Sequence, residues 1–162
     1  TNTPYGESPV STAMGAYFNK KAYTDPALRR KYTRMGFWVN IRLIRYPDVL
    51  LMAAESANEK GLMGEASGYL EQVRAHARGT LTNVLPKVES LDQSVLREAI
   101  RHERRVELGL EPDRFYDLVR WGIAQEVLQA AGKNYQPKNA LLPLPQTEID
   151  KSNGVLIQNP DY

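Results

Sequence analysis

Two neighbouring segments of this sequence place apolar residues at helical spacing, and a glycine follows each of them. Steps of three and four residues put such side chains on one face of an amphipathic helix. The first set is Tyr46, Val49, Leu50, Ala53 and Ala57, and the second is Ala66, Tyr69, Leu70, Val73 and Ala77. Gly61 and Gly79 can end the two helices. The sequence therefore predicts an antiparallel helical hairpin.

The predicted hairpin has about the length of one tetratricopeptide-type repeat, which is roughly 34 residues. Such repeats are stable when three or more of them stack, and no second copy occurs at that period in the 162 residues. The sequence also starts with TNTPYGESPVST, which has neither an initiator Met nor the architecture of a signal peptide. We therefore expect the chain to be one part of a longer protein.

Three further helices are predicted after the hairpin. Ser90 and Gln93 are spaced as a capping box at the start of the third. Its apolar residues keep helical phase to about Glu111, and they are Leu96, Ala99, Ile100, Val106 and Leu110. Pro112 then interrupts the chain. A short fourth helix contains Phe115, Leu118 and Val119 and ends near Gly122, and a fifth runs from about Ile123 to Ala131.

The two ends of the chain have no sustained helical period. Prolines and glycines recur through residues 1–44, where Asp25 and Pro26 could start one brief helix. Residues 133–162 contain four prolines and are expected to lie extended over the helices. The predicted fold is all-α, with tetratricopeptide-like hairpins in a single domain over residues 1–162. Residues 1–44 form an irregular lead-in, 45–132 the helical part, and 133–162 an extended tail.

Charged residues are dense between residues 101 and 122. Glu103 and Glu107 stand one helical turn apart, as a pair of glycosidase acids might, but such acids flank a scissile bond and usually come from different elements. Arginines accompany both glutamates, which favours salt bridges between helices over catalysis. We predict a structural charge network of Glu103, Arg104, Glu107, Arg114, Asp117 and Arg120. Replacing Glu103 or Arg104 by Ala should lower stability without removing an enzymatic step.

Several other chemistries find no support in the sequence. There is no cysteine, and the two histidines, His76 and His102, are far apart, so neither a disulfide nor a transition-metal site is expected. No glycine-rich phosphate loop and no G-x-S-x-G turn occurs, and no cofactor is predicted. Residues 1–50 carry eight Lys and Arg against three Asp and Glu, which is too mild a bias to predict a nucleic-acid partner. The apolar runs are too short for a membrane span.

The two tryptophans have different surroundings in the sequence. Trp121 follows Phe115 and Leu118 on the fourth helix and is predicted to pack in the core. Trp38 lies in a loop-like region, where anchoring in the core is favoured and stacking on a sugar is the alternative. We name Trp38, and Arg42 four residues after it, as the candidate ligand contacts.

Six blocks in this order resemble the C-terminal part of the SusD/RagB family of outer-membrane nutrient-binding lipoproteins. They are IRYPDVLLMAAESANEKG at 44–61, LEQVRAHAR at 70–78, LREAIRHERRVEL at 96–108, RFYDLVRWG at 114–122, LPLPQTEI at 142–149 and QNPDY at 158–162. Each block is weak alone, but their succession is specific. The resemblance implies a scaffold of tetratricopeptide-like helix pairs.

The resemblance also implies a function. Family members are non-catalytic binders of glycans or peptides at the surface of Bacteroidetes cells, where a lipidated N-terminal cysteine anchors them to the outer membrane. They close over a SusC-type TonB-dependent transporter, which is the expected partner together with an oligosaccharide or polysaccharide. The anchor cysteine is absent from this chain. The alternative from another class is a helical-repeat module that docks a protein and has no glycan site of its own.

Overall fold

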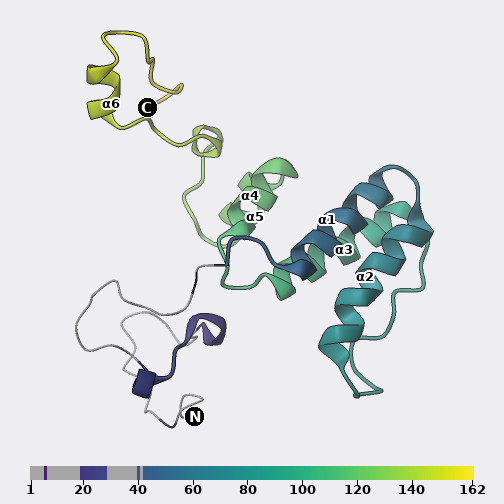
Figure 1. Cartoon of the computed structure of the whole chain (residues 1–162). Coiled ribbons are helices and arrows are strands. Elements are labelled where there is room, and N and C mark those ends of the chain that lie inside the picture. Colours follow the sequence, from purple (N-terminus) through teal and green to yellow (C-terminus); the bar gives the residue numbers. More distant parts are fainter. Residues whose placement is uncertain (1–5, 7–18, 29–39, 41) are drawn as a thin grey trace. The chain divides into compact units, whose positions relative to one another are not determined.

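The computed structural model describes residues 6, 19–28, 40 and 42–162, and every regular element in these ranges is a helix (Figure 1). The predicted all-α class is confirmed. Six α-helices are α1 (Tyr46–Glu59), α2 (Met63–Arg78), α3 (Gln93–Glu107), α4 (Asp113–Arg120), α5 (Ala124–Ala130) and α6 (Gln146–Lys151). Three short 3-10 helices are η1 (Lys20–Ala22), η2 (Pro26–Leu28) and η3 (Pro137–Ala140). The chain divides into two compact units, Thr1–Leu110 and Glu111–Tyr162.

Helices α1, α2 and α3 pack side by side and share the core of the first unit (Figure 1). Gly61, with φ 78°, lies in the short turn between α1 and α2, and Gly79, with φ 58°, caps the end of α2. Both predicted glycine stops therefore stand where the helices end. The buried apolar side chains are Leu50, Leu51, Ala54, Ala57, Ala66, Leu70, Val73, Leu96 and Ile100.

The buried face of α1 differs from the predicted one. Tyr46 and Val49 were expected in the core but are exposed, whereas Leu51 and Ala54 are fully buried. Helix α1 contacts both α2 and α3, so its buried arc is centred between the two neighbours and not on the predicted stripe. Ala77 of α2 is likewise exposed.

The start of α3 also corrects the prediction. Its N-cap is Asp92, whose carboxylate accepts hydrogen bonds from the Ser94 and Val95 amides at 2.9 Å each. The Ser90 hydroxyl accepts instead from the Asp92 amide, and the Gln93 side chain donates to the carbonyl of Asn58 on α1 at 2.7 Å. The predicted capping pair therefore serves the loop and the contact between α1 and α3.

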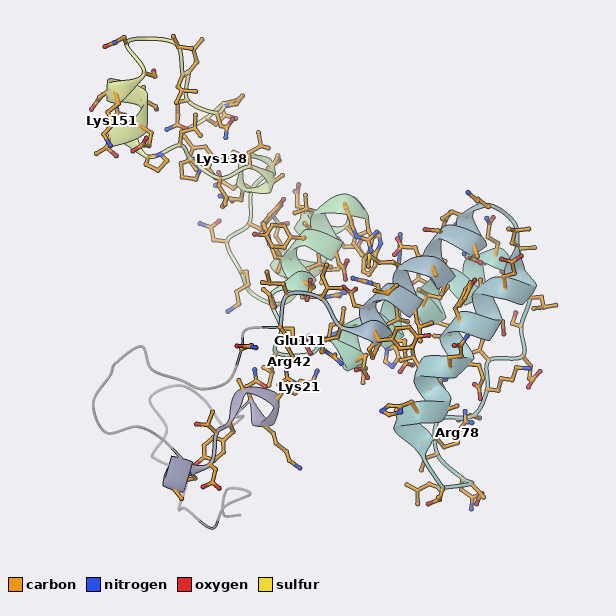
Figure 2. All side chains as sticks on the ribbon, viewed as in Figure 1. Lys21, Arg42, Arg78, Glu111, Lys138 and Lys151 are labelled. Carbon is orange, nitrogen blue, oxygen red and sulfur yellow. The ribbon has the colours of Figure 1, made fainter. Side chains whose placement is uncertain are left out.

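Three side chains of α2 hold the loop that leads to α3. The Ser67 hydroxyl donates to the carbonyl of Val88, and the Arg74 guanidinium donates to that of Pro86. Arg78 donates to the carbonyls of Val84 and Leu85 and pairs with Glu71 (Figure 2). We call these three side chains the α2 ladder. Within residues 84–88, the atoms that these side chains bind are backbone oxygens.

The second unit has a smaller core between α4 and α5. Leu118, Ala124 and Tyr135 are buried there, with Phe115 and Ile123 packed against them. Trp121 is not part of this cluster, contrary to the prediction. It is half-buried at the end of α4, with the guanidinium of Arg120 4.9 Å and that of Arg114 5.8 Å from the ring centroid.

The two predicted irregular segments contain short helices. Pro26–Leu28 forms η2, and the Ala27 amide donates to the Asp25 carboxylate at 2.9 Å, which confirms the expected cap. The tail at 133–162 includes η3 and α6, which sequence periodicity missed because each spans six residues or fewer.

Candidate functional site

The inner face of α3 changes from apolar to charged along the helix. Leu96 and Ile100 are buried, and one turn later Glu103 and Arg104 are buried too, while Val106, expected in this stripe, is exposed. A buried charge is tolerated when a partner neutralises it and fills its hydrogen bonds. Glu103 and Arg104 should therefore each have a partner of opposite charge on a neighbouring helix.

Glu103 and Arg104 pair with different helices. The Glu103 carboxylate accepts from Arg74 of α2 at 2.6 Å, and the Glu103 side chain is only 4% exposed. Arg104 donates to Asp48 of α1 at 2.9 Å, and its side chain is 5% exposed. Two adjacent residues of opposite charge thus connect α3 to both of its neighbours.

Glu107, one turn further along, lies at the end of α3. The Nη1 group of Arg45 donates a hydrogen bond to the Glu107 carboxylate at 2.8 Å, and its Nη2 group donates one to the Glu107 carbonyl at 2.9 Å. The ammonium of Lys21 donates to the same carbonyl, and Asn19 donates to the carbonyl of Leu110 at 3.0 Å. Cations at a helix C-terminus interact favourably with its unpaired carbonyls and its dipole.

Another ion pair of the first unit joins α1 and α3 at a more exposed position. Arg97 donates two hydrogen bonds to the Glu59 carboxylate, at 2.6 and 2.8 Å. These bonds lower the pKa of the Glu59 carboxyl and raise the pKa of the Arg97 guanidinium. The Glu59 side chain is 47% exposed, so solvent screens much of this interaction.

The other three residues of the predicted network lie on α4. Asp117 is buried and accepts from the Arg120 guanidinium at 2.9 Å. Arg114 and Arg120 both stand over the ring of Trp121. The ion pairs described for Glu103, Arg104 and Glu107 thus lie within the first unit, and the contacts described for Arg114, Asp117 and Arg120 lie within the second.

The two candidate ligand contacts have different outcomes. Trp38 lies outside the described residues. Arg42 is exposed, and its guanidinium donates to the backbone carbonyl of Lys21 at 2.8 Å. Figure 2 labels the two residues close together. Arg42 thus connects the segment before α1 to η1, and the assignment as a ligand contact stays a prediction.

Sequence reasoning missed the residues that complete the ion pairs, namely Asp48, Arg74 and the side chain of Arg45. Two of them carried a detectable signal. Asp48 precedes the buried Leu51 by three residues, and Arg74 follows the buried Leu70 by four. Each therefore occupies the helical phase of a core position, where a charged residue implies a buried partner.

The described ranges show neither a candidate metal site nor a candidate membrane span. No group of three or more His, Asp and Glu residues there is arranged to hold a metal ion. No helix in the part of the chain that the structure describes is long and apolar enough to span a bilayer.

Comparison with known proteins decides the family. The family model described as "SusD family" matches residues 1–162. The chain belongs to the SusD family. Among curated members, SusD-like protein P25 of Formosa agariphila is 39% identical over 90% of this chain and 27% of its own length. SusD-like protein P2 of the same organism is 36% identical over 74% of this chain and 25% of its own length.

A solved member of the SusD family has the same helical fold. The crystal structure of a SusD homologue from Bacteroides thetaiotaomicron superimposes with a TM-score of 0.66 and 32% sequence identity. The match covers 74% of this chain and 26% of the solved one. The present chain thus spans about a quarter of the length of these SusD-family relatives.

Proposed function

We propose that this chain belongs to a non-catalytic protein that binds glycans or other nutrients at the bacterial cell surface and delivers them to a SusC-like TonB-dependent transporter. The observation that carries the proposal is the match of the SusD-family model to residues 1–162. The helical likeness to a SusD homologue supports it. A lipid anchor on a preceding part of the protein would hold it at the outer membrane.

The arrangement of the acidic residues supports binding without chemistry. A glycosidase needs one carboxyl group to donate a proton and a second to attack or activate water. Here the Glu103 carboxylate accepts from Arg74, and the Glu107 carboxylate accepts from Arg45. Hydrogen bonds from these arginines occupy both carboxylates, which suits helix packing better than proton donation.

The proposal can be tested on the full-length protein with a panel of oligosaccharides. We expect calorimetry to detect binding to at least one of them. A reducing-end assay should detect no cleavage, and Glu103→Gln and Glu107→Gln variants should not differ from the wild type in that assay. Absence of binding to polysaccharides and peptides alike would refute nutrient capture. Cleavage that disappears in either variant would refute the non-catalytic role.

The two candidate ligand contacts need their own variants. If Trp38 and Arg42 contact the ligand, Trp38→Ala and Arg42→Ala should each weaken binding of the identified oligosaccharide. Arg105→Ala is a suitable control because Arg105 is an exposed residue of α3. Equal affinity of all three variants and the wild type would remove both residues from the site.

A docking role is the second candidate, because apolar side chains are exposed just before and at the start of α1. Leu43, Ile44 and Tyr46 are 75%, 68% and 69% exposed, and clustered apolar exposure is typical of interaction surfaces. A pull-down with the transporter encoded beside the gene separates the two functions. A strong complex that Leu43→Ser and Ile44→Ser weaken, without glycan binding, would favour docking.

A further inference from the structure

The segment 141–145 has the sequence Leu-Leu-Pro-Leu-Pro and is poorly suited to pair with a strand. Pro143 and Pro145 have no backbone N–H, so Leu144 carries the only amide hydrogen between them. A β-ladder needs such donors at regular intervals. The polar backbone groups of this segment must therefore find other partners.

Gln158 supplies the first of these partners. Its side-chain oxygen accepts from the Leu144 amide at 2.8 Å, and its side-chain nitrogen donates to the Leu144 carbonyl at 2.9 Å. The same oxygen also accepts from the Asn159 amide at 2.9 Å. A primary amide has the same donor and acceptor groups as a peptide bond, so Gln158 pairs with Leu144 as a neighbouring strand residue would.

Asn159 and Tyr162 continue the pairing along the segment. The Asn159 side chain donates to the carbonyl of Leu142 at 2.6 Å. The Tyr162 hydroxyl donates to the carbonyl of Leu141 at 2.9 Å. Leu142 and Leu144 are two residues apart, so in an extended chain their carbonyls face the same edge. Gln158 and Asn159 thus satisfy backbone groups along that edge, and Tyr162 binds the carbonyl of Leu141 at the start of the segment.

Lys138 binds the last two residues of the chain. Its ammonium donates to the carbonyl of Asp161 at 2.9 Å and lies 5.0 Å from the centroid of the Tyr162 ring. Residues 138 and 162 are therefore held together by a hydrogen bond to the neighbouring backbone and by a cation–π contact.

We propose that Gln158, Asn159 and Tyr162 form a side-chain clip on the backbone of residues 141–145, in which Gln158 and Asn159 take the place of a neighbouring β-strand. The clip closes residues 138–162 into one loop that opens and closes as a unit. Because only backbone groups are bound, the side chains of Leu141 and Leu142 stay at the surface, 52% and 67% exposed. This inference concerns the conformation of the tail and does not depend on the proposed function.

Amide hydrogen exchange of the 162-residue chain, followed by NMR, tests the clip. Gln158→Ala should speed exchange of the Leu144 amide about fivefold, since a lost hydrogen bond of this kind contributes on the order of 1 kcal/mol. Gln146→Ala is the matched control, because Gln146 is in the same unit but donates to Asp150 within α6. It should leave Leu144 unchanged. The Ile123 amide, which donates to the Leu118 carbonyl within the same unit, reports whether each variant remains folded.

Tyr162→Phe tests whether the clip acts as a unit. This variant keeps the ring beside Lys138 and removes the hydroxyl bond to Leu141. It should also speed exchange of the Leu144 amide, by about threefold or more. Unchanged exchange at Leu144 in Gln158→Ala would overturn the clip. An effect of Gln158→Ala without any effect of Tyr162→Phe would overturn its action as one unit.

Discussion

Arg104 occupies a position on α3 where an apolar residue would normally stand, and its pairing with Asp48 makes that position tolerable. Arg104→Met should lower the free energy of unfolding by about 3–5 kcal/mol, because it leaves the Asp48 carboxylate buried without this partner. Urea denaturation followed by circular dichroism measures the change. Arg105→Met is the control, since Arg105 is exposed on the same helix and should change stability by about 0.5 kcal/mol or less.

The double variant Asp48→Leu with Arg104→Met should recover much of the stability lost in Arg104→Met. Replacing both members of a buried ion pair by apolar residues removes the cost of desolvating the charges. If Arg104→Met alone were as stable as Arg105→Met, the ion pair between Asp48 and Arg104 would contribute little to the stability of the fold.

Arg45 makes two contacts with one residue, and lysine cannot reproduce both. The guanidinium binds the side chain and the carbonyl of Glu107 with separate nitrogens. Arg45→Lys keeps the charge but loses the planar fork, so we expect the free energy of unfolding to fall by about 1 kcal/mol. Thermal unfolding of this variant beside Arg105→Lys checks the expectation. Equal melting temperatures would contradict it.

At the level of single residues, the sequence identified one side of each buried pair and missed the other. Glu103 and Arg104 were recognised from the local density of charge. Their partners lie 29 and 56 residues away in the chain, on α2 and α1. Contacts at that separation depend on how helices pack, and spacing within one helix does not determine them. Arginines that are close in sequence, such as Arg114 and Arg120, were therefore predicted as members of the charge network.

At the scale of single helices, the N-cap of α3 predicts that the stability of the protein depends on pH. Hydrogen bonds from the Ser94 side chain and from the Val95 amide lower the pKa of the Asp92 carboxyl. A lowered pKa in the folded state means that the ionised group adds stability above its pKa in the unfolded chain, which is about 3.9. This stability is lost as pH falls through the lower folded value.

We therefore expect Asp92→Ala to be less stable than the wild type at neutral pH, and the difference to shrink below about pH 4. Urea midpoints measured from pH 7 to pH 2.5 give the comparison. Asp92→Asn keeps a capping side chain without a charge, so its stability difference from the wild type should be smaller at neutral pH. A difference between wild type and Asp92→Ala that is constant across this range would refute the assignment.

Helix positions were predicted better than helix faces. Gly61 and Gly79 ended α1 and α2 as expected, because a glycine at a helix end has a local conformational reason. The inward face of α1 was placed wrongly, because Tyr46 and Val49 fit the same period as Leu50. Which of two overlapping stripes is buried depends on the number and position of neighbouring helices.

For the molecule as a whole, the first unit rests on one apolar cluster shared by three helices. Leu96 is fully buried in it. Leu96→Ala should lower the free energy of unfolding by about 2–5 kcal/mol, because the lost methyl and methylene groups leave a cavity. Val95→Ala is the matched control, since Val95 is 50% exposed at the position that precedes Leu96 on α3. Chemical denaturation that gave both variants the same stability would contradict the assigned core.

The family and the helical class of the whole chain followed from sequence, but its division into two units did not. The boundary between Leu110 and Glu111 falls inside the region predicted as one helical part, beside Pro112. The proline predicted an interruption between helices, and no sequence pattern indicated that the apolar residues on its two sides form separate clusters. The clip of the tail could not be predicted from the sequence either, because hydrogen bonds from side-chain amides to the backbone produce no periodic pattern of residues.

The α2 ladder has a consequence for engineering. Val88 packs against the core of the first unit and has to be kept. The rest of the loop is held through carbonyl oxygens, which every residue type presents alike, so the identity of the side chains at 84 and 87 is weakly constrained by these contacts. Leu85 is the exception, because its φ of 46° is a conformation that glycine adopts with less strain. This loop is therefore a place to graft a short foreign epitope or a fluorophore-labelling peptide while Ser67, Arg74 and Arg78 keep the graft docked.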